Sequence, residues 1–165
     1  MGASAQRGME RAFEEARAAA ERGEVPVGAA ILRDHELIAA AGNRTLEWKD
    51  PTAHAEIIAI REAARLIGSE RLIGCDLYVT LEPCAMCAGA ISFARIRRLY
   101  YGAADEKGGA VDHGTRFFSS PICHHAPEVY GGLGEVEAGA LLKDFYTARE
   151  ISPKPITRNT RDILF

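Results

Sequence analysis

The hydrophobic and polar positions of this chain change their period several times, which predicts alternating helices and strands. Helical spacing or helix-forming composition covers residues 9–21, 51–67, 84–93 and 136–150, and short apolar runs that favour strands cover 27–32, 37–41, 77–81 and 98–101. Asp34 and His35 separate the first two runs and predict a hairpin turn. Residues 102–134 are rich in glycine and predict irregular chain. The alternation predicts an α/β sheet covered by helices on both faces.

The length of 165 residues suits a single domain with a substantial core. We assign this domain to residues 1–150 and expect residues 151–165, which include two prolines, to form an extended tail. The net charge of −3 does not indicate a nucleic-acid binder, so any such binding must come from a local patch. We find no signal region and no apolar run long enough to span a membrane. We therefore expect a cytoplasmic protein with reduced cysteines, which are better explained as ligands than as disulfides.

Two short segments together predict a catalytic zinc site. Cys84 and Cys87 follow Pro83 and share one face of the predicted helix, and His54 supplies a third ligand of the kind that zinc prefers. Three protein ligands leave the fourth position of a tetrahedral zinc open to water, whose pKa falls to roughly 7 when it is bound. Glu56, two residues after His54, is then a proton shuttle.

Both halves of this predicted site lie near the start of a helix. Asp50 and Pro51 predict an N-cap and a first helical position just before His54. Pro83 likewise opens the cysteine helix, and the partial positive charge of a helix N-terminus lowers thiol pKa values. A purely structural zinc site is the alternative, but it requires a fourth ligand and leaves Glu56 without a role.

Other histidines and cysteines are expected to have ordinary roles. His124 and His125 lie in a loop-like segment and should make loop contacts or contacts to a substrate edge. Cys75 and Cys123 are interpreted as small packing side chains. His35 is expected to be solvated in its turn.

Longer segments around the zinc motif extend the prediction to a known family. They are residues 24–29 (EVPVGA), 42–44 (GNR), 50–56 (DPTAHAE), 77–90 (LYVTLEPCAMCAGA) and 94–96 (ARI). With these segments the chain resembles the bacterial tRNA-specific adenosine deaminases, within the cytidine-deaminase-like superfamily, over roughly residues 9–149. The pattern H-x-E…P-C-x-x-C is the known signature of zinc deaminases, so by itself it indicates only the superfamily. The flanking segments indicate the adenosine branch.

The resemblance implies a three-layer α/β/α sandwich of the cytidine deaminase type with a central five-stranded mixed sheet, one zinc ion per subunit and a homodimer. It implies conversion of adenosine to inosine at the wobble position of tRNA, by attack of zinc hydroxide with Glu56 carrying the protons. The implied substrate-binding roles are Asn43 on the purine, Val25 and Pro26 as pocket wall, the backbone N–H groups of Ala55 and Cys84 at the water or oxyanion, Asp105 on a neighbouring ribose, and Lys107 on a phosphate.

Some positions have a second explanation. Asp105 also suits a turn before two glycines, and the basic run 95–98 also suits a solvated or structural face. Of the basic residues that usually follow Asp-Phe-Phe in the last helix of the family, only Arg149 is present here, and the resemblance implies that it contacts the substrate. Phosphate contacts dominate nucleic-acid affinity. Two alternatives therefore stay open: a deaminase of a free base or nucleoside of the guanine or cytosine type, and a catalytically silent, zinc-stabilised RNA-binding subunit.

Overall fold

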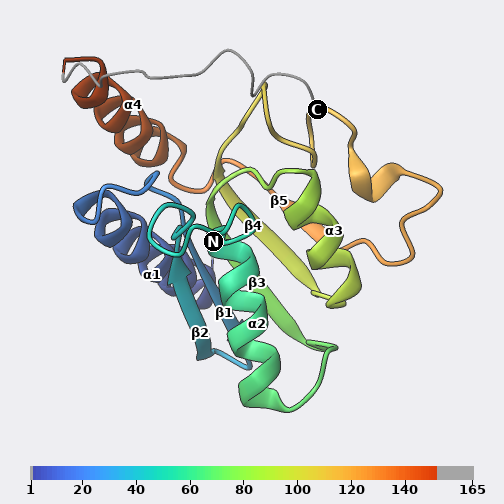
Figure 1. Ribbon diagram of the computed structural model, residues 1–165. Coiled ribbons are helices and arrows are strands. Elements are labelled where there is room, and N and C mark those ends of the chain that lie inside the picture. Colours follow the sequence, from blue (N-terminus) through green and yellow to red (C-terminus); the bar gives the residue numbers. More distant parts are fainter. Residues whose placement is uncertain (1, 152–165) are drawn as a thin grey trace.

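Five strands form one mixed sheet in the order β2-β1-β3-β4-β5 in this computed structural model, which describes residues 2–151 (Figure 1). The strands are β1 (Gly28–Arg33), β2 (Glu36–Gly42), β3 (Cys75–Leu81), β4 (Arg98–Ala103) and β5 (Glu128–Tyr130). β1 pairs antiparallel with β2 and β3, whereas β3, β4 and β5 run parallel. The predicted tail lies outside the described residues, apart from residue 151.

Helices cover both faces of the sheet. α1 (Ala3–Glu21) and α4 (Glu135–Ile151) lie on one face, and α2 (Ala55–Ile67) and α3 (Ala85–Phe93) lie on the other (Figure 1). The expected three-layer α/β/α sandwich with a five-stranded mixed sheet is therefore confirmed. Among the described residues, no helix combines the length and the apolar character that crossing a bilayer requires.

The alternation of side chains along β1 explains why one short strand serves two cores. Ala29 and Ile31 pack toward α2, and Ala30 and Leu32 pack toward α1, as expected when successive side chains point to opposite faces. Ile31 is fully buried, and a side chain of this size contributes about 1.5–3 kcal/mol on burial. Helices thus pack on both faces of the sheet, and this packing fixes the positions of the strand ends.

A glycine allows α1 to lie directly on this strand. A Cβ atom at Gly28 would lie 1.9 Å from the backbone oxygen of Ala12, which no real side chain tolerates. The side chains of α1 at this contact are also small, since the fully buried residues include Ala12, Ala16 and Ala19. This close packing brings the C-terminal end of α1 next to residues 42–43.

The hairpin prediction is confirmed, because Asp34 and His35 both adopt positive φ angles of 50° and 67° between β1 and β2. Positive φ at both central residues is typical of two-residue hairpin turns whose twist matches that of the strands. His35 is exposed, as expected, although its Nδ1 lies 2.7 Å from Ser4 Oγ.

The predicted start of the second helix is wrong. The side chain of Asp50 accepts hydrogen bonds from the backbone N–H and the hydroxyl of Thr52, at 2.8 and 2.7 Å, so it stabilises a turn and not a helix N-terminus. α2 begins four residues later than predicted, at Ala55, and His54 is its N-cap.

The segment predicted to be irregular also contains regular structure. η1 (Phe117–Ser119) is a short 3₁₀ helix, and β5 adds a parallel strand to the edge of the sheet. β5 has only three residues, so its pairing with β4, and not a local apolar pattern, determines the strand. The first helix begins at Ala3, six residues before the predicted start.

Candidate active site

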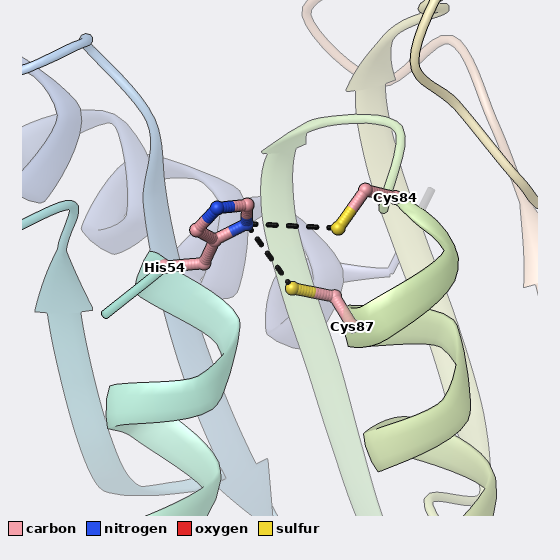
Figure 2. A group of neighbouring side chains, drawn as sticks. All are labelled: His54, Cys84 and Cys87. Atoms are coloured by element: carbon pink, nitrogen blue, oxygen red, sulfur yellow. Dashed lines mark hydrogen bonds between the residues drawn. The ribbon is translucent and has the colours of Figure 1, made fainter. Parts of the chain in front are cut away.

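Three side chains that the sequence predicts as metal ligands converge between the starts of α2 and α3 (Figure 2). His54 Nδ1 lies 3.6 Å from Cys84 Sγ and 3.5 Å from Cys87 Sγ. A tetrahedral zinc with Zn–S bonds of about 2.3 Å and a Zn–N bond of about 2.0–2.1 Å places its nitrogen and sulfur ligands about 3.6 Å apart. The observed distances therefore fit one shared zinc ion without rearrangement.

The two helix starts explain how residues 30 positions apart reach this geometry. His54 and Cys84 are the N-cap residues of α2 and α3, both with extended backbone, and neither side chain caps its own helix. Their side chains are therefore free to face each other. Cys87 lies in the first turn of α3 and is fully buried.

The thiol of Cys84 favours the ionised form that a metal requires. A hydrogen bond from Cys87, and then one from His54, lowers the pKa of Cys84 to about 4 despite its partial burial. The hydrogen bond with Cys84 in turn raises the pKa of His54. The positive ends of two helix dipoles act in the same direction on the thiolate.

Glu56 lies in the first turn of α2 and is only 4% exposed. Burial raises the pKa of its carboxyl group, which also accepts a hydrogen bond from Cys87. A buried carboxyl with a raised pKa, placed next to a candidate metal site, is typical of a group that transfers protons. The sequence-based expectation for Glu56 is thus compatible with its surroundings.

A pocket of about 270 Å³ opens onto these groups. Its lining residues come from five segments of the chain: Val25, Val27, Asn43, Thr45, His54, Ala55, Glu56, Leu81, Glu82, Cys84, Asp105 and Gly108. A larger groove of about 580 Å³ runs along the outer face of α2, but none of the three candidate zinc ligands lines it. The smaller pocket is therefore the one suited to chemistry.

Asn43 presents an unsatisfied polar atom at the wall of this pocket. Its Nδ2 donates long hydrogen bonds of 3.5 Å to Glu24 and Thr45, while its Oδ1 is buried with no partner among the described residues. Leaving such a group unpaired costs about 1–3 kcal/mol. A ligand in the pocket would relieve this cost, which suits the predicted contact of Asn43 with a base.

Asp105 both stabilises a turn and lines the pocket. Its Oδ1 accepts hydrogen bonds from the backbone N–H groups of Lys107 and Gly108, at 3.1 and 2.9 Å, so it stabilises a turn. The same residue also lines the pocket. The turn therefore holds Asp105 at the pocket wall.

Three other predicted substrate contacts do not line the pocket. Pro26 is fully buried behind the wall, and Lys107 is exposed on the turn. The guanidinium of Arg149 donates a hydrogen bond of 3.1 Å to the backbone oxygen of Gly23 and lies 4.4 Å from the ring centre of Phe145. Arg149 thus ties α4 to the end of α1, beside the pocket wall.

The basic run after α3 has structural partners. Arg97 makes two hydrogen bonds of 2.9 Å to Asp76, and Arg98 donates one of 3.1 Å to Glu128. These pairs lie at the end of the sheet where β3 and β4 begin. They favour the structural interpretation of this run.

The expected loop role of the histidine pair is met for His125, whose Nε2 lies 2.7 Å from the backbone oxygen of Ile96. Cys123 contacts the backbone oxygen of His125 at 3.1 Å. Among residues 2–151, only His54, Cys84 and Cys87 form a group that could bind a metal.

Two buried carboxylates beside the pocket were not anticipated from the sequence. Glu24 accepts hydrogen bonds from the backbone N–H groups of Leu46 and Glu47, at 3.3 and 2.7 Å. Glu82 makes a similar set of contacts with residues 105–113. Burial acts to raise the pKa of Glu82, but hydrogen bonds from His113 and the backbone outweigh burial and lower it. The only sequence signal was an acidic residue in an otherwise apolar segment.

The layered fold and the histidine–cysteine group beside a buried glutamate define the class of zinc-dependent deaminases. Residues 3–103 match the family described as the cytidine and deoxycytidylate deaminase zinc-binding region. The tRNA-specific adenosine deaminase of Agrobacterium fabrum is 62% identical over 143 residues, which span 87% of this chain and 94% of that protein.

Two solved structures extend the comparison. One, from studies of A-to-I editing by tRNA:A34 deaminases at the wobble position, has a TM-score of 0.82 and 64% identity, covering 83% of this chain and 99% of that one. The guanine deaminase of Bacillus subtilis has a TM-score of 0.61 and 31% identity, covering 93% and 98%. The chain belongs to the tRNA-specific adenosine deaminase branch of the cytidine and deoxycytidylate deaminase family.

Proposed function

We propose that this protein is a zinc-dependent hydrolase that converts adenosine to inosine at the wobble position of tRNA. The observation that carries this function is the placement of Glu56 and the three candidate ligands on one pocket, in a chain 62% identical to a tRNA-specific adenosine deaminase. Such a pocket suits a flipped base, which must leave its stack before its amine-bearing carbon can be reached.

The residues of the pocket have different chemical roles. His54, Cys84 and Cys87 hold one zinc ion per subunit, and when bound this ion supplies a nucleophilic water of lowered pKa. The carboxylate of Glu56 would accept one proton from the attacking water while the water oxygen bonds to the carbon that bears the amine. Glu56 would pass this proton to the adjacent ring nitrogen. It would then take the second proton of the water, from the hydroxyl group now on that carbon, and pass it to the amine, which departs as ammonia. Metal analysis of the purified protein, with one zinc per chain expected, tests the stoichiometry.

Substrate contacts surround this centre. Asn43 hydrogen-bonds the purine through its unsatisfied amide, and Val25 supports one wall. The backbone N–H groups of Ala55 and Cys84, at the starts of two helices, face the developing negative charge. Asp105 binds the ribose of a neighbouring nucleotide, with Lys107 close to a phosphate. Pro26 and Arg149 act indirectly, behind the wall and between helices.

The direct test is an inosine assay. Zinc-loaded protein is incubated with the anticodon stem-loop of an arginine tRNA that carries adenosine at the wobble position, and nucleosides from the digested RNA are quantified by mass spectrometry. We expect inosine at that position alone. No inosine from protein with full zinc content would refute the proposal.

A deaminase of free guanine is the second candidate. It is supported by the likeness to the guanine deaminase of Bacillus subtilis and by the net charge of −3. A panel of free bases and nucleosides of the guanine, cytosine and adenine types separates the two candidates. Turnover on the stem-loop with none on the panel excludes this alternative, and turnover of guanine alone excludes tRNA.

The larger groove along α2 supports the expected homodimer. It combines the apolar side chains of Trp48 and Ile57 with charges of both signs, Arg61, Arg65 and Glu62. A surface of mixed charge can complement a second copy of itself across a two-fold axis. A molar mass of twice the chain by light scattering supports the dimer, and a monomer at all concentrations refutes it. An enzyme of tRNA would act in the cytoplasm.

A further inference from the structure

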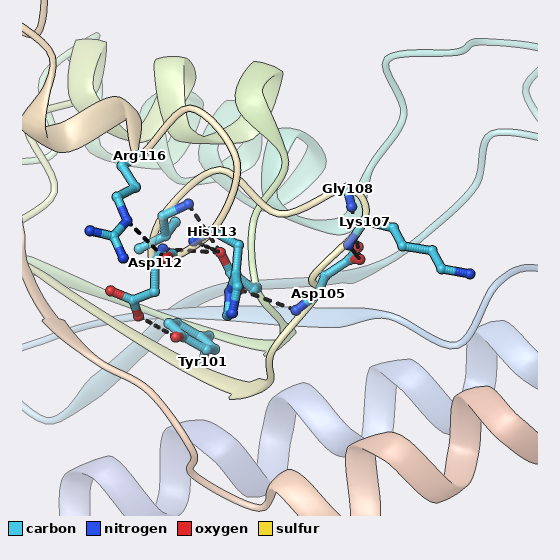
Figure 3. A network of polar contacts seen from close by, with 9 residues as sticks. Tyr101, Asp105, Lys107, Gly108, Asp112, His113 and Arg116 are labelled. Atoms are coloured by element: carbon cyan, nitrogen blue, oxygen red, sulfur yellow. Dashed lines mark hydrogen bonds and ion pairs between the residues drawn. The ribbon is translucent and has the colours of Figure 1, made fainter.

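Glu82 follows β3 directly, and its side chain is 0% exposed. One carboxylate oxygen accepts hydrogen bonds from the backbone N–H of Asp105 at 3.1 Å and faces His113 Nδ1 at 2.7 Å. The other accepts the backbone N–H groups of three consecutive residues, Val111, Asp112 and His113, at 3.0–3.1 Å. Figure 3 shows this network, with Asp112 and His113 on one side and Asp105, next to Lys107 and Gly108, on the other.

These hydrogen bonds compensate for the free energy lost when the charged carboxylate is removed from water. A buried carboxylate is tolerated where hydrogen-bond donors surround it, and Glu82 has five. Four of them are backbone N–H groups of residues 105–113, so the carboxylate replaces the ladder partners that this irregular segment lacks. Glu82 therefore holds both ends of this segment, while Asp105 holds the turn at Lys107 and Gly108.

The segment that Glu82 holds is a wall of the pocket. Asp105 and Gly108 line the pocket, and the backbone N–H of Ala110 donates a hydrogen bond of 2.9 Å to the oxygen of Pro83. Space around the segment is tight, because a Cβ atom at Gly109 would lie 2.6 Å from the Glu82 carboxyl and 2.4 Å from the backbone oxygen of Asp105. A small shift at Glu82 would therefore displace Asp105.

We propose that Glu82 is a positioning residue that sets where Asp105 meets the nucleotide next to the target adenosine. This inference rests on the proposed function. Its effect is on substrate binding, because the carboxylate holds the wall that touches the neighbouring nucleotide and does not reach the reacting carbon. The loss should therefore be uniform for ground state and transition state, which raises KM and leaves kcat nearly unchanged.

Glu82→Gln tests this role with little change in volume. The amide keeps one acceptor oxygen but presents an N–H group in place of the other, so the donors of residues 105–113 that faced the replaced oxygen lose their partner. We expect KM for the stem-loop to rise about 10- to 100-fold, the effect of losing one hydrogen bond to a charged group, with unchanged zinc content. Hydrogen exchange at residues 105–113, followed by mass spectrometry, should accelerate. Asp76→Asn is the matched control, since Asp76 is also buried but pairs with Arg97 away from the pocket.

Gly109→Ala should displace the same segment without any substitution of Glu82 or Asp105. The added methyl group must push the segment away from the Glu82 carboxyl. We expect the same rise in KM and the same faster exchange. Gly139→Ala is its control, because a Cβ atom there meets nothing within 4 Å.

The outcomes separate cleanly. Raised KM with faster exchange in both variants supports the positioning role. Loss of zinc with a matching fall in kcat would show that Glu82 supports Cys84 instead, and unchanged exchange or unchanged KM would show that it does not hold the wall for substrate. An active wild type in these cases leaves the proposed function standing. A wild type inactive on the stem-loop overturns the proposed function and, with it, this inference.

Discussion

Replacing Glu56 by glutamine should abolish turnover and leave the protein folded. Glu56 is 4% exposed, and glutamine fills the same space, so no cavity forms and no core contact is lost. The amide cannot accept the proton of the attacking water or deliver one to the ring nitrogen. The substitution therefore separates proton transfer from packing and from metal binding.

The magnitude follows from the number of proton transfers that Glu56 performs. A positioned acid or base contributes typically about 10²- to 10⁴-fold per reaction step. In the proposed mechanism Glu56 serves both the attacking water and the leaving amine, so we expect kcat to fall roughly 10⁴-fold, which is about 5.4 kcal/mol at 1.36 kcal/mol per decade. Zinc content and the melting temperature should match the wild type.

Single-turnover inosine formation on the stem-loop measures this loss over the required range. Glu70→Gln is a matched control, because Glu70 is exposed beyond the end of α2 and should keep wild-type activity. Activity within tenfold of the wild type in Glu56→Gln would refute the assignment of the proton shuttle. If the wild type itself shows no turnover on any base while it binds zinc and RNA, the silent-subunit alternative is correct.

Three further predictions concern the metal, the fold and the dimer. Cys87→Ala should lose its zinc and melt at a lower temperature, since ligand binding is coupled to folding; full zinc occupancy by metal analysis would contradict this. Gly28→Ala should lose about 3 kcal/mol or more of unfolding free energy in urea, because its methyl group would overlap the Ala12 oxygen, whereas Gly139→Ala should not. Trp48→Glu places a charge in the groove along α2, so light scattering should show a shift toward monomer; an unchanged mass would place the dimer contact elsewhere.

The close approach of the candidate ligands follows from the short-range order of the sequence. His54 and Glu56 are two residues apart, Cys84 and Cys87 are three apart, and each pair occupies one helix start. The sheet between them supplies the rest, because β3 ends just before the cysteine helix. Spacing and strand order therefore suffice to bring the ligands together.

Errors arose where competing local or distant contacts decide the structure. The predicted helix start at Asp50 failed because the same side-chain oxygen caps a turn at Thr52. Asp and Asn side chains support both turns and helix N-termini, and sequence alone does not distinguish the two. The role of Glu82 cannot be predicted from local sequence, because its hydrogen-bond donors lie 23–31 residues further along the chain.

The residues proposed for zinc chemistry and those proposed for substrate selection lie in different parts of this structure. The candidate ligands and Glu56 lie at two helix starts packed against the sheet. Two of the five segments that line the pocket, around residues 43–47 and 105–113, are irregular, and each is held by a buried glutamate. A guanine deaminase shares the fold at 31% identity, so the fold alone cannot select adenosine. We infer that the pocket walls around Asn43 and Asp105 select the substrate. Substitutions of Glu24 or Glu82 should accordingly change substrate binding more than they change zinc content.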